Sequence, residues 1–83
     1  MFQGMEYVYA VYKEKSFSRA AEKLFISQPS LSANVKRVEK NVGYSIFDRS
    51  TKPIGLTEAG KKYIQTVEQI LSMQNEFSEY IND

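Results

Sequence analysis

The residues with the clearest chemical potential lie between Phe25 and Ser32, in the stretch FISQPSLS. Its serines and its glutamine carry hydroxyl and amide groups, which can hydrogen-bond to phosphate oxygens and to the edges of nucleic-acid bases. From Leu31 onward, apolar residues recur at the spacing of one helix face, so the stretch opens a helix. Ser27 is the expected N-cap, and Pro29 suits the first turn because it has no amide that needs a partner.

The outward face of this predicted helix differs from an ordinary solvated surface. Opposite Leu31, the face is small near the helix start and cationic further along, with Pro29, Ala33, Lys36 and Lys40 flanked by Ser32 and Arg37. Small residues at the start would let the backbone approach a flat, anionic partner. Gln28 could pair with adenine N6 and N7, although it could also do no more than support the helix cap.

The composition argues against catalysis and against a metal or cofactor. The 83 residues suffice for one small domain, and they include neither cysteine nor histidine. Thiolate metal sites and the usual general base are therefore excluded, and the serines have no histidine to activate them. Asp48 and Glu58 could form a carboxylate pair, but we expect a surface charge and a helix-start acid instead. We find neither a signal segment nor a membrane span, and we expect a cytoplasmic protein.

The charge is unevenly distributed along the chain. The net charge is only +1, but all eleven lysines and arginines lie between Lys13 and Lys62, together with five acidic residues. That segment therefore carries +6, while residues 63–83 carry −4. A basic segment of this kind indicates a polyanionic partner.

The apolar pattern predicts a mainly α-helical domain. A first helix carries Phe2, Met5, Val8, Tyr9 and Tyr12 and ends near Lys15. A second begins after Ser16, with Phe17, Ala20, Ala21 and Leu24 on one face, and a three-residue turn leads to the third, which ends at Gly43. Residues 46–49 and Leu56 then predict a short hairpin, or wing, around STKPIG. Thr57 caps a long final helix, in which Gly60 is the one weak helix former.

The long helix carries an apolar stripe with the spacing of a heptad seam. We expect this stripe to contact a second chain, because a 25-residue helix is roughly 37 Å long and a small domain cannot cover all of it. The alternative is packing against its own domain. The predicted dimerisation residues are Tyr63, Val67, Ile70, Leu71, Phe77 and Ile81, with Gln74 interrupting the seam.

Two helices joined by a three-residue turn, the second with a small and then basic outward face, predict a helix-turn-helix that enters the major groove of DNA. A winged-helix module for protein interaction and a different family of winged-helix regulators are the alternatives. We expect DNA contacts from Ser16, Ser18, Arg19, Ser27, Gln28, Pro29, Ser30, Ser32, Ala33, Lys36, Arg37, Arg49, Ser50 and Lys52.

The sequence resembles the N-terminal winged helix-turn-helix of LysR-type transcriptional regulators over about residues 2–62. The matching elements, in order, are Ser16-Phe17 with Ala20-Ala21 and Leu24, then 27–32 (SQPSLS), Val38-Glu39 with Gly43, Phe47 with Arg49, and 56–60 (LTEAG). The wing departs from the resemblance at Lys52-Pro53, where the family's loop is more basic.

The resemblance implies a bacterial DNA-binding regulator that recognises an interrupted palindrome as a homodimer through its linker helix. On this basis residues 1–58 form the DNA-binding domain, with the helix-turn-helix at about 18–37, and residues 59–83 form the linker helix. In the family a larger effector-binding domain follows, so the chain resembles an isolated DNA-binding fragment. A small-molecule effector is then expected only in the full-length protein.

Overall fold

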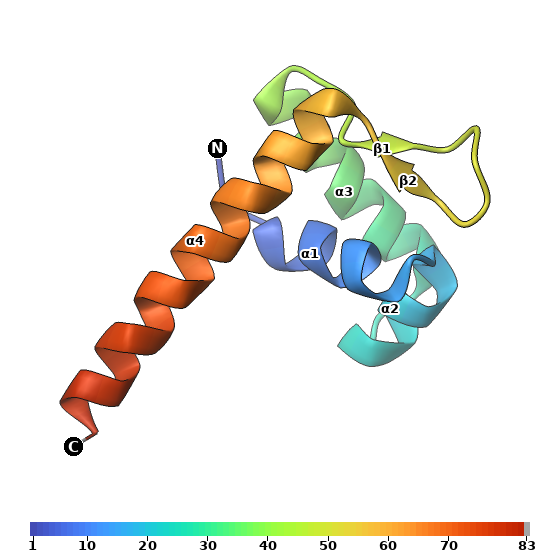
Figure 1. The fold of residues 1–83 in the computed structure, drawn as a ribbon. Helices are drawn as coiled ribbons and strands as arrows, with labels where there is room; N and C mark the ends of the chain where they lie inside the picture. Colours follow the sequence, from blue (N-terminus) through green and yellow to red (C-terminus); the bar gives the residue numbers. More distant parts are fainter. Residues whose placement is uncertain (83) are drawn as a thin grey trace.

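The computed structural model describes residues 1–82 and is mainly helical, as predicted (Figure 1). The elements, in order, are α1 (Met5–Glu14), α2 (Phe17–Leu24), α3 (Gln28–Val42), β1 (Phe47–Asp48), β2 (Gly55–Leu56) and α4 (Glu58–Ile81). Three helices and a two-stranded wing thus precede one long helix, which confirms the predicted fold class. Asp83, the last residue of the predicted linker segment, lies outside the described residues.

The helices α2, α3 and α4 begin where local side-chain chemistry predicts. The side chains of Ser16, Ser27 and Thr57 each accept a hydrogen bond from the backbone N–H three residues on, at 3.2, 3.2 and 2.9 Å. These bonds satisfy amide donors that have no partner inside the helix. At the other end of α3, Gly43 adopts a left-handed conformation with φ of 90°.

The core lies where α1, α2 and α3 meet the root of the wing and the start of α4. Fully buried side chains include Val8 and Val11 of α1, Ala20 of α2, and Leu31 and Val35 of α3. The α1 face that is buried therefore runs through Val8 and Val11, while Tyr9 and Tyr12 are only partly covered. The small side chain of Ala20 allows α1 and α2 to cross closely.

The wing is an antiparallel ladder in which Phe47 pairs with Leu56 and Asp48 with Gly55. Glu39 of α3 fixes its root, because Glu39 Oε2 accepts hydrogen bonds from the backbone N–H groups of Ile46 at 2.7 Å and Phe47 at 3.3 Å. The loop between the strands extends away from the helices (Figure 1).

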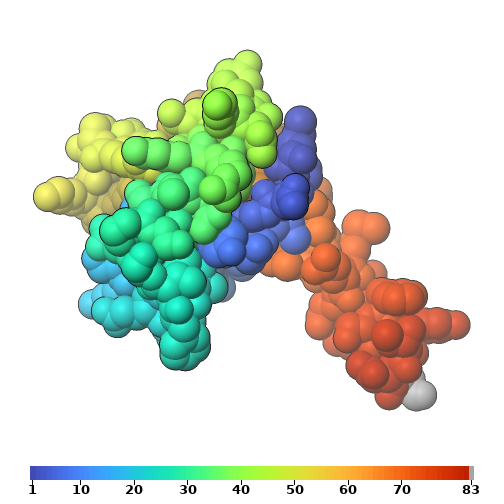
Figure 2. Space-filling view, turned by 180° about the vertical axis from the view of Figure 1, so that it is seen from behind, coloured from blue at the N-terminus to red at the C-terminus, as the bar shows by residue number. Residues whose placement is uncertain are grey.

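The first half of the long helix α4 packs in the core, and its second half is exposed to solvent. Gly60, Tyr63, Ile64 and Val67 are buried in the core, whereas every described residue from Ser72 onward is exposed. The exposed half extends from the body as a free arm (Figures 1 and 2). Tyr63 and Val67, two of the predicted dimerisation residues, are buried by their own domain.

Candidate nucleic-acid interface

A groove of about 290 Å³ opens between the start of α3 and the wing. It brings together two predicted DNA-contacting residues of α3, Gln28 and Ser32, and two of the wing, Arg49 and Lys52. The remaining walls of the groove are formed by Phe17, Thr51 and Ile54, which the sequence did not assign to the site.

The side chain of Gln28, at the start of α3, is held by a hydrogen bond from α2. Ser18 Oγ, in the first turn of α2, donates to Gln28 Oε1 at 3.0 Å. Both residues are exposed. Gln28 thus presents a carboxamide whose oxygen already has one partner, while its Nε2 donors have no hydrogen-bond partner among residues 1–82.

Arg49 leaves the end of β1 and is fixed by two contacts. Its guanidinium carbon lies 5.0 Å from the centre of the Phe17 ring, and its Nη2 atom lies 3.7 Å from Glu39 Oε1. The side chain is still 43% exposed. An ion pair this long and this exposed is weak, so the guanidinium can still bind an anion from the groove side.

The wing loop contains a tight polar turn. Asp48 Oδ1 accepts hydrogen bonds from the backbone N–H of Ser50 at 3.0 Å and from its hydroxyl at 2.5 Å. These bonds hold the pKa of the Asp48 carboxyl below its usual value, because they stabilise the charged form. The Ser50 hydroxyl hydrogen is therefore committed to Asp48, and only its oxygen and the shape of the loop remain for a DNA contact.

The outward face of α3 carries the predicted small and basic residues. Pro29, Ala33 and Lys36 are exposed, and no element of residues 1–82 covers them. The hydroxyls of Ser16 and Ser27 accept the capping bonds, which leaves their hydrogens free to donate. The other predicted polar contacts at the helix starts, Arg19 and Ser30, are exposed.

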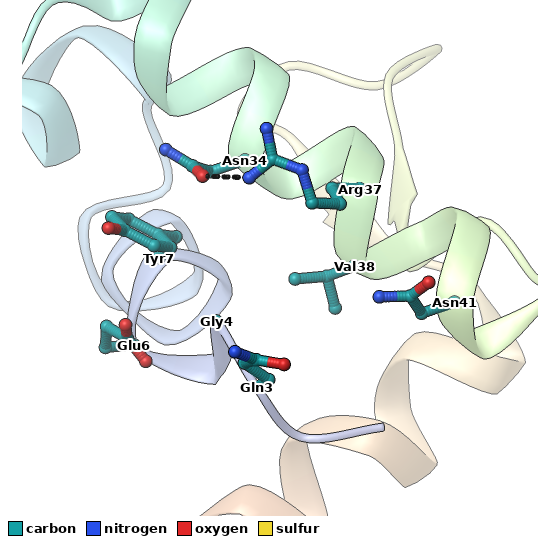
Figure 3. Close-up of a pocket in the computed structure, with 8 residues that line it drawn as sticks. All are labelled: Gln3, Gly4, Glu6, Tyr7, Asn34, Arg37, Val38 and Asn41. Carbon is teal, nitrogen blue, oxygen red and sulfur yellow. Dashed lines mark hydrogen bonds between the residues drawn. The ribbon is translucent and has the colours of Figure 1, made fainter.

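Arg37 lies apart from this groove. It lines a separate hollow of about 330 Å³ between the start of α1 and α3, opposite Glu6 and Tyr7 (Figure 3). Its Nη1 atom donates to Asn34 Oδ1 at 2.7 Å. Arg37 and Arg49 therefore lie in two separate hollows on different sides of α3 and not in one patch.

Among residues 1–82, no cluster of acidic side chains has the grouping that a metal ion requires. Within the same range, no helix is long and apolar enough to cross a membrane.

Three helices, a wing and an exposed polar face on the third helix define a winged helix-turn-helix DNA-binding domain. Residues 2–61 match the family described as "Bacterial regulatory helix-turn-helix protein, lysR family", and the chain belongs to this family. A probable RuBisCO transcriptional regulator of Trieres chinensis is 41% identical over 81 residues, which make up 98% of this chain and 26% of that protein. The chain therefore spans about a quarter of that relative's length, and the relatives are transcriptional regulators rather than enzymes.

Solved structures agree with this assignment. The DNA-binding domain of BenM, in complex with catB site 1 DNA, is 30% identical with a TM-score of 0.86, covering 95% of this chain and 85% of that one. DarR of Vibrio fischeri, also solved with DNA, is 31% identical with a TM-score of 0.85, covering 100% of this chain and 28% of that one.

Proposed function

We propose that the chain binds double-stranded DNA sequence-specifically as a homodimer, on an interrupted palindrome, as part of a cytoplasmic transcription regulator. The observation that carries the proposal is the groove between α3 and the wing, where Gln28 and Ser32 face Arg49 and Lys52. Hydrogen-bonding groups at the start of an exposed helix suit base edges, and the cations beside them suit phosphates.

In this arrangement the start of α3 enters the major groove and the wing lies along the adjacent backbone. Pro29 and Ala33 lack long side chains, so the α3 backbone can approach the bases closely. Lys36, one turn further, extends toward the phosphates. Cations so placed give affinity on every sequence, whereas the residues of the helix start give preference for one.

The proposed dimer contact is the exposed half of α4. Met73, Phe77, Tyr80 and Ile81 are all more than half exposed, which is unusual for large apolar side chains. An apolar groove of about 180 Å³ lies at the base of the same helix, between α1 and α4, and is lined by Met5, Glu6, Tyr9, Ala10, Val67 and Leu71.

A second copy of α4 has the spacing to fill this groove. Gln74 stands midway between Val67 and Ile81, so two helices that cross antiparallel at Gln74 bring Ile81 of one chain to the groove of the other. The same register sets Phe77 against Leu71. Such a dimer has two-fold symmetry and predicts inverted half-sites about one helical turn, ~34–36 Å, apart. We place effector binding in the remaining length of the full regulator.

The deciding experiment is a salt-titrated DNA-binding measurement on this chain, with a palindromic operator from a genomic footprint and a scrambled duplex. We expect the logarithm of the affinity to fall linearly with the logarithm of salt concentration on both duplexes, with the operator preferred throughout. Absence of salt-dependent binding to either duplex would instead support a protein-interaction module.

A further inference from the structure

Ser18 and Gln28 connect the two helices of the helix-turn-helix at the point where the reading helix begins. Ser18 lies in the first turn of α2 and Gln28 is the first residue of α3, and the hydrogen bond between their side chains measures 3.0 Å. Gln28 lines the groove, whereas Ser18 does not. The serine therefore contacts the glutamine from outside the groove, from the first turn of α2.

In the structure the bond occupies one of the two lone pairs of the carboxamide oxygen and leaves both N–H groups of the carboxamide unpaired among the described residues. A glutamine side chain has an acceptor oxygen and two N–H donors, and here Oε1 already accepts from the Ser18 hydroxyl. The donors on Nε2 have no hydrogen-bond partner among the described residues. An unpaired glutamine could turn either end outward, whereas the paired one presents donors first.

The two purines differ in what they offer to such a group. The major-groove edge of guanine carries two acceptors, O6 and N7, while that of adenine carries the N7 acceptor and the N6 donor. Pairing with both adenine groups requires Oε1 as well as Nε2. A carboxamide whose oxygen is held back toward α2 therefore suits guanine better than adenine.

We propose that Ser18 is a specificity-determining residue that acts through Gln28, holding the carboxamide so that α3 selects guanine over adenine at one base pair of each half-site. This inference rests on the proposed function, since it presumes that Gln28 reads a base. It assigns Ser18 a positioning role rather than a direct contact with the DNA backbone.

The test is a set of affinities for operators that carry each of the four bases at the position that Gln28 reads. That position is the base pair at which Gln28→Ala removes the preference. For the wild type we expect about a tenfold preference for guanine over adenine, which is the discrimination that one good contact supplies. Ser18→Ala should reduce the ratio to about twofold or less, and Ser18→Thr, which keeps the hydroxyl, should retain it.

A double-variant cycle separates this role from a direct contact. If Ser18 acts through Gln28, Ser18→Ala has no effect on any of the four operators once Gln28→Ala is present. Equal weakening on all four operators, additive with Gln28→Ala, would show a backbone contact and overturn the proposal. An unchanged guanine preference in Ser18→Ala would overturn it too.

Two controls keep the outcomes distinct. Ser72→Ala removes an exposed hydroxyl from α4, far from the groove, and should leave every ratio unchanged. A wild-type chain without any sequence preference would refute the proposed function itself. A wild type that prefers its operator but reads adenine at this position would refute only the role of Ser18.

Discussion

Gly60 of α4 lies directly against the backbone carbonyl of Ile46, at the root of the wing. A Cβ atom on Gly60 would overlap the Ile46 carbonyl oxygen and would stand 2.9 Å from the carbonyl carbon. The same oxygen accepts a hydrogen bond from the backbone N–H of Thr57 at 3.0 Å. The wing and α4 are therefore joined backbone to backbone, and only glycine fits between them.

The first prediction concerns this contact. Gly60→Ala should lower the free energy of unfolding by about 1–3 kcal/mol, the usual cost of an overpacked core. A loss of stability would be informative, because in an open helix the change from glycine to alanine stabilises the fold by ~1 kcal/mol. Urea unfolding measures the change, and Gln65→Ala, at an exposed position of α4, is the control. A Gly60→Ala chain as stable as the wild type would contradict the close approach.

The second prediction concerns the cations on the DNA-facing side. Lys36→Ala and Arg49→Ala should each weaken binding on operator and scrambled duplexes alike, and each should flatten the salt slope by about one unit. Lys13→Ala is a control with the same change in charge, because Lys13 lies over the Tyr9 ring on α1, 5.7 Å from its centre. If Lys36→Ala and Arg49→Ala change the salt slope no more than Lys13→Ala does, the side chains of Lys36 and Arg49 do not contact phosphates.

Much of the fold could be predicted because its signals are local. The capping side chains of Ser16, Ser27 and Thr57 each bond to a backbone N–H only three residues further along the chain. The neighbouring sequence alone therefore determines where these helices begin. Gly43 ends α3 for the equally local reason that it accepts a left-handed conformation.

Other features depend on how the helices cross, which no local pattern records. An apolar stripe looks the same whether its own domain or a second chain covers it, so the burial of Tyr63 and Val67 in their own core could not be predicted from the sequence. The hydrogen bond between Ser18 and Gln28 and the separation of Arg37 from Arg49 likewise follow from tertiary packing. The sequence marks Phe17 as apolar, but its place in the groove wall could not be predicted because it depends on where the wing lies.

The third prediction concerns the Tyr63 hydroxyl, which is buried without a hydrogen-bond partner among residues 1–82. Tyr63→Phe removes this uncompensated group and should raise the free energy of unfolding by about 1 kcal/mol at neutral pH. Tyr44→Phe, at an exposed position, is the control and should change little. An equally stable or less stable Tyr63→Phe chain would show that the hydroxyl is satisfied.

The same residue gives an expectation for alkaline pH. Burial, with a smaller effect from the charge of Glu6, raises the pKa of Tyr63 above its ordinary value of 10.0. A raised pKa means that the folded state holds its proton more tightly than the unfolded state. The associated stability is complete below about pH 10 and is lost as the pH rises above it, so Tyr63→Phe should show a shallower alkaline loss in unfolding experiments.

The last prediction concerns assembly through α4. Phe77 and Ile81 are 64% and 60% exposed and lie outside the core, so Phe77→Glu with Ile81→Glu should leave the domain folded. Placing charges in the proposed seam should prevent pairing, because they would lose their hydration on burial. Sedimentation should therefore show a dimeric wild type and a monomeric variant. The variant should also lose the advantage of a whole palindrome over a single half-site, since two linked domains bind more tightly than one.

The choice of variants matters for this test. Val67→Glu is unsuitable, because it would unfold the core and remove DNA binding for a different reason. Gln65→Glu with Ser72→Glu adds the same charge on the opposite, exposed side of α4 and should stay dimeric. A dimeric Phe77→Glu, Ile81→Glu chain, or a wild type that is monomeric on and off DNA, would show that this half of α4 is not the contact.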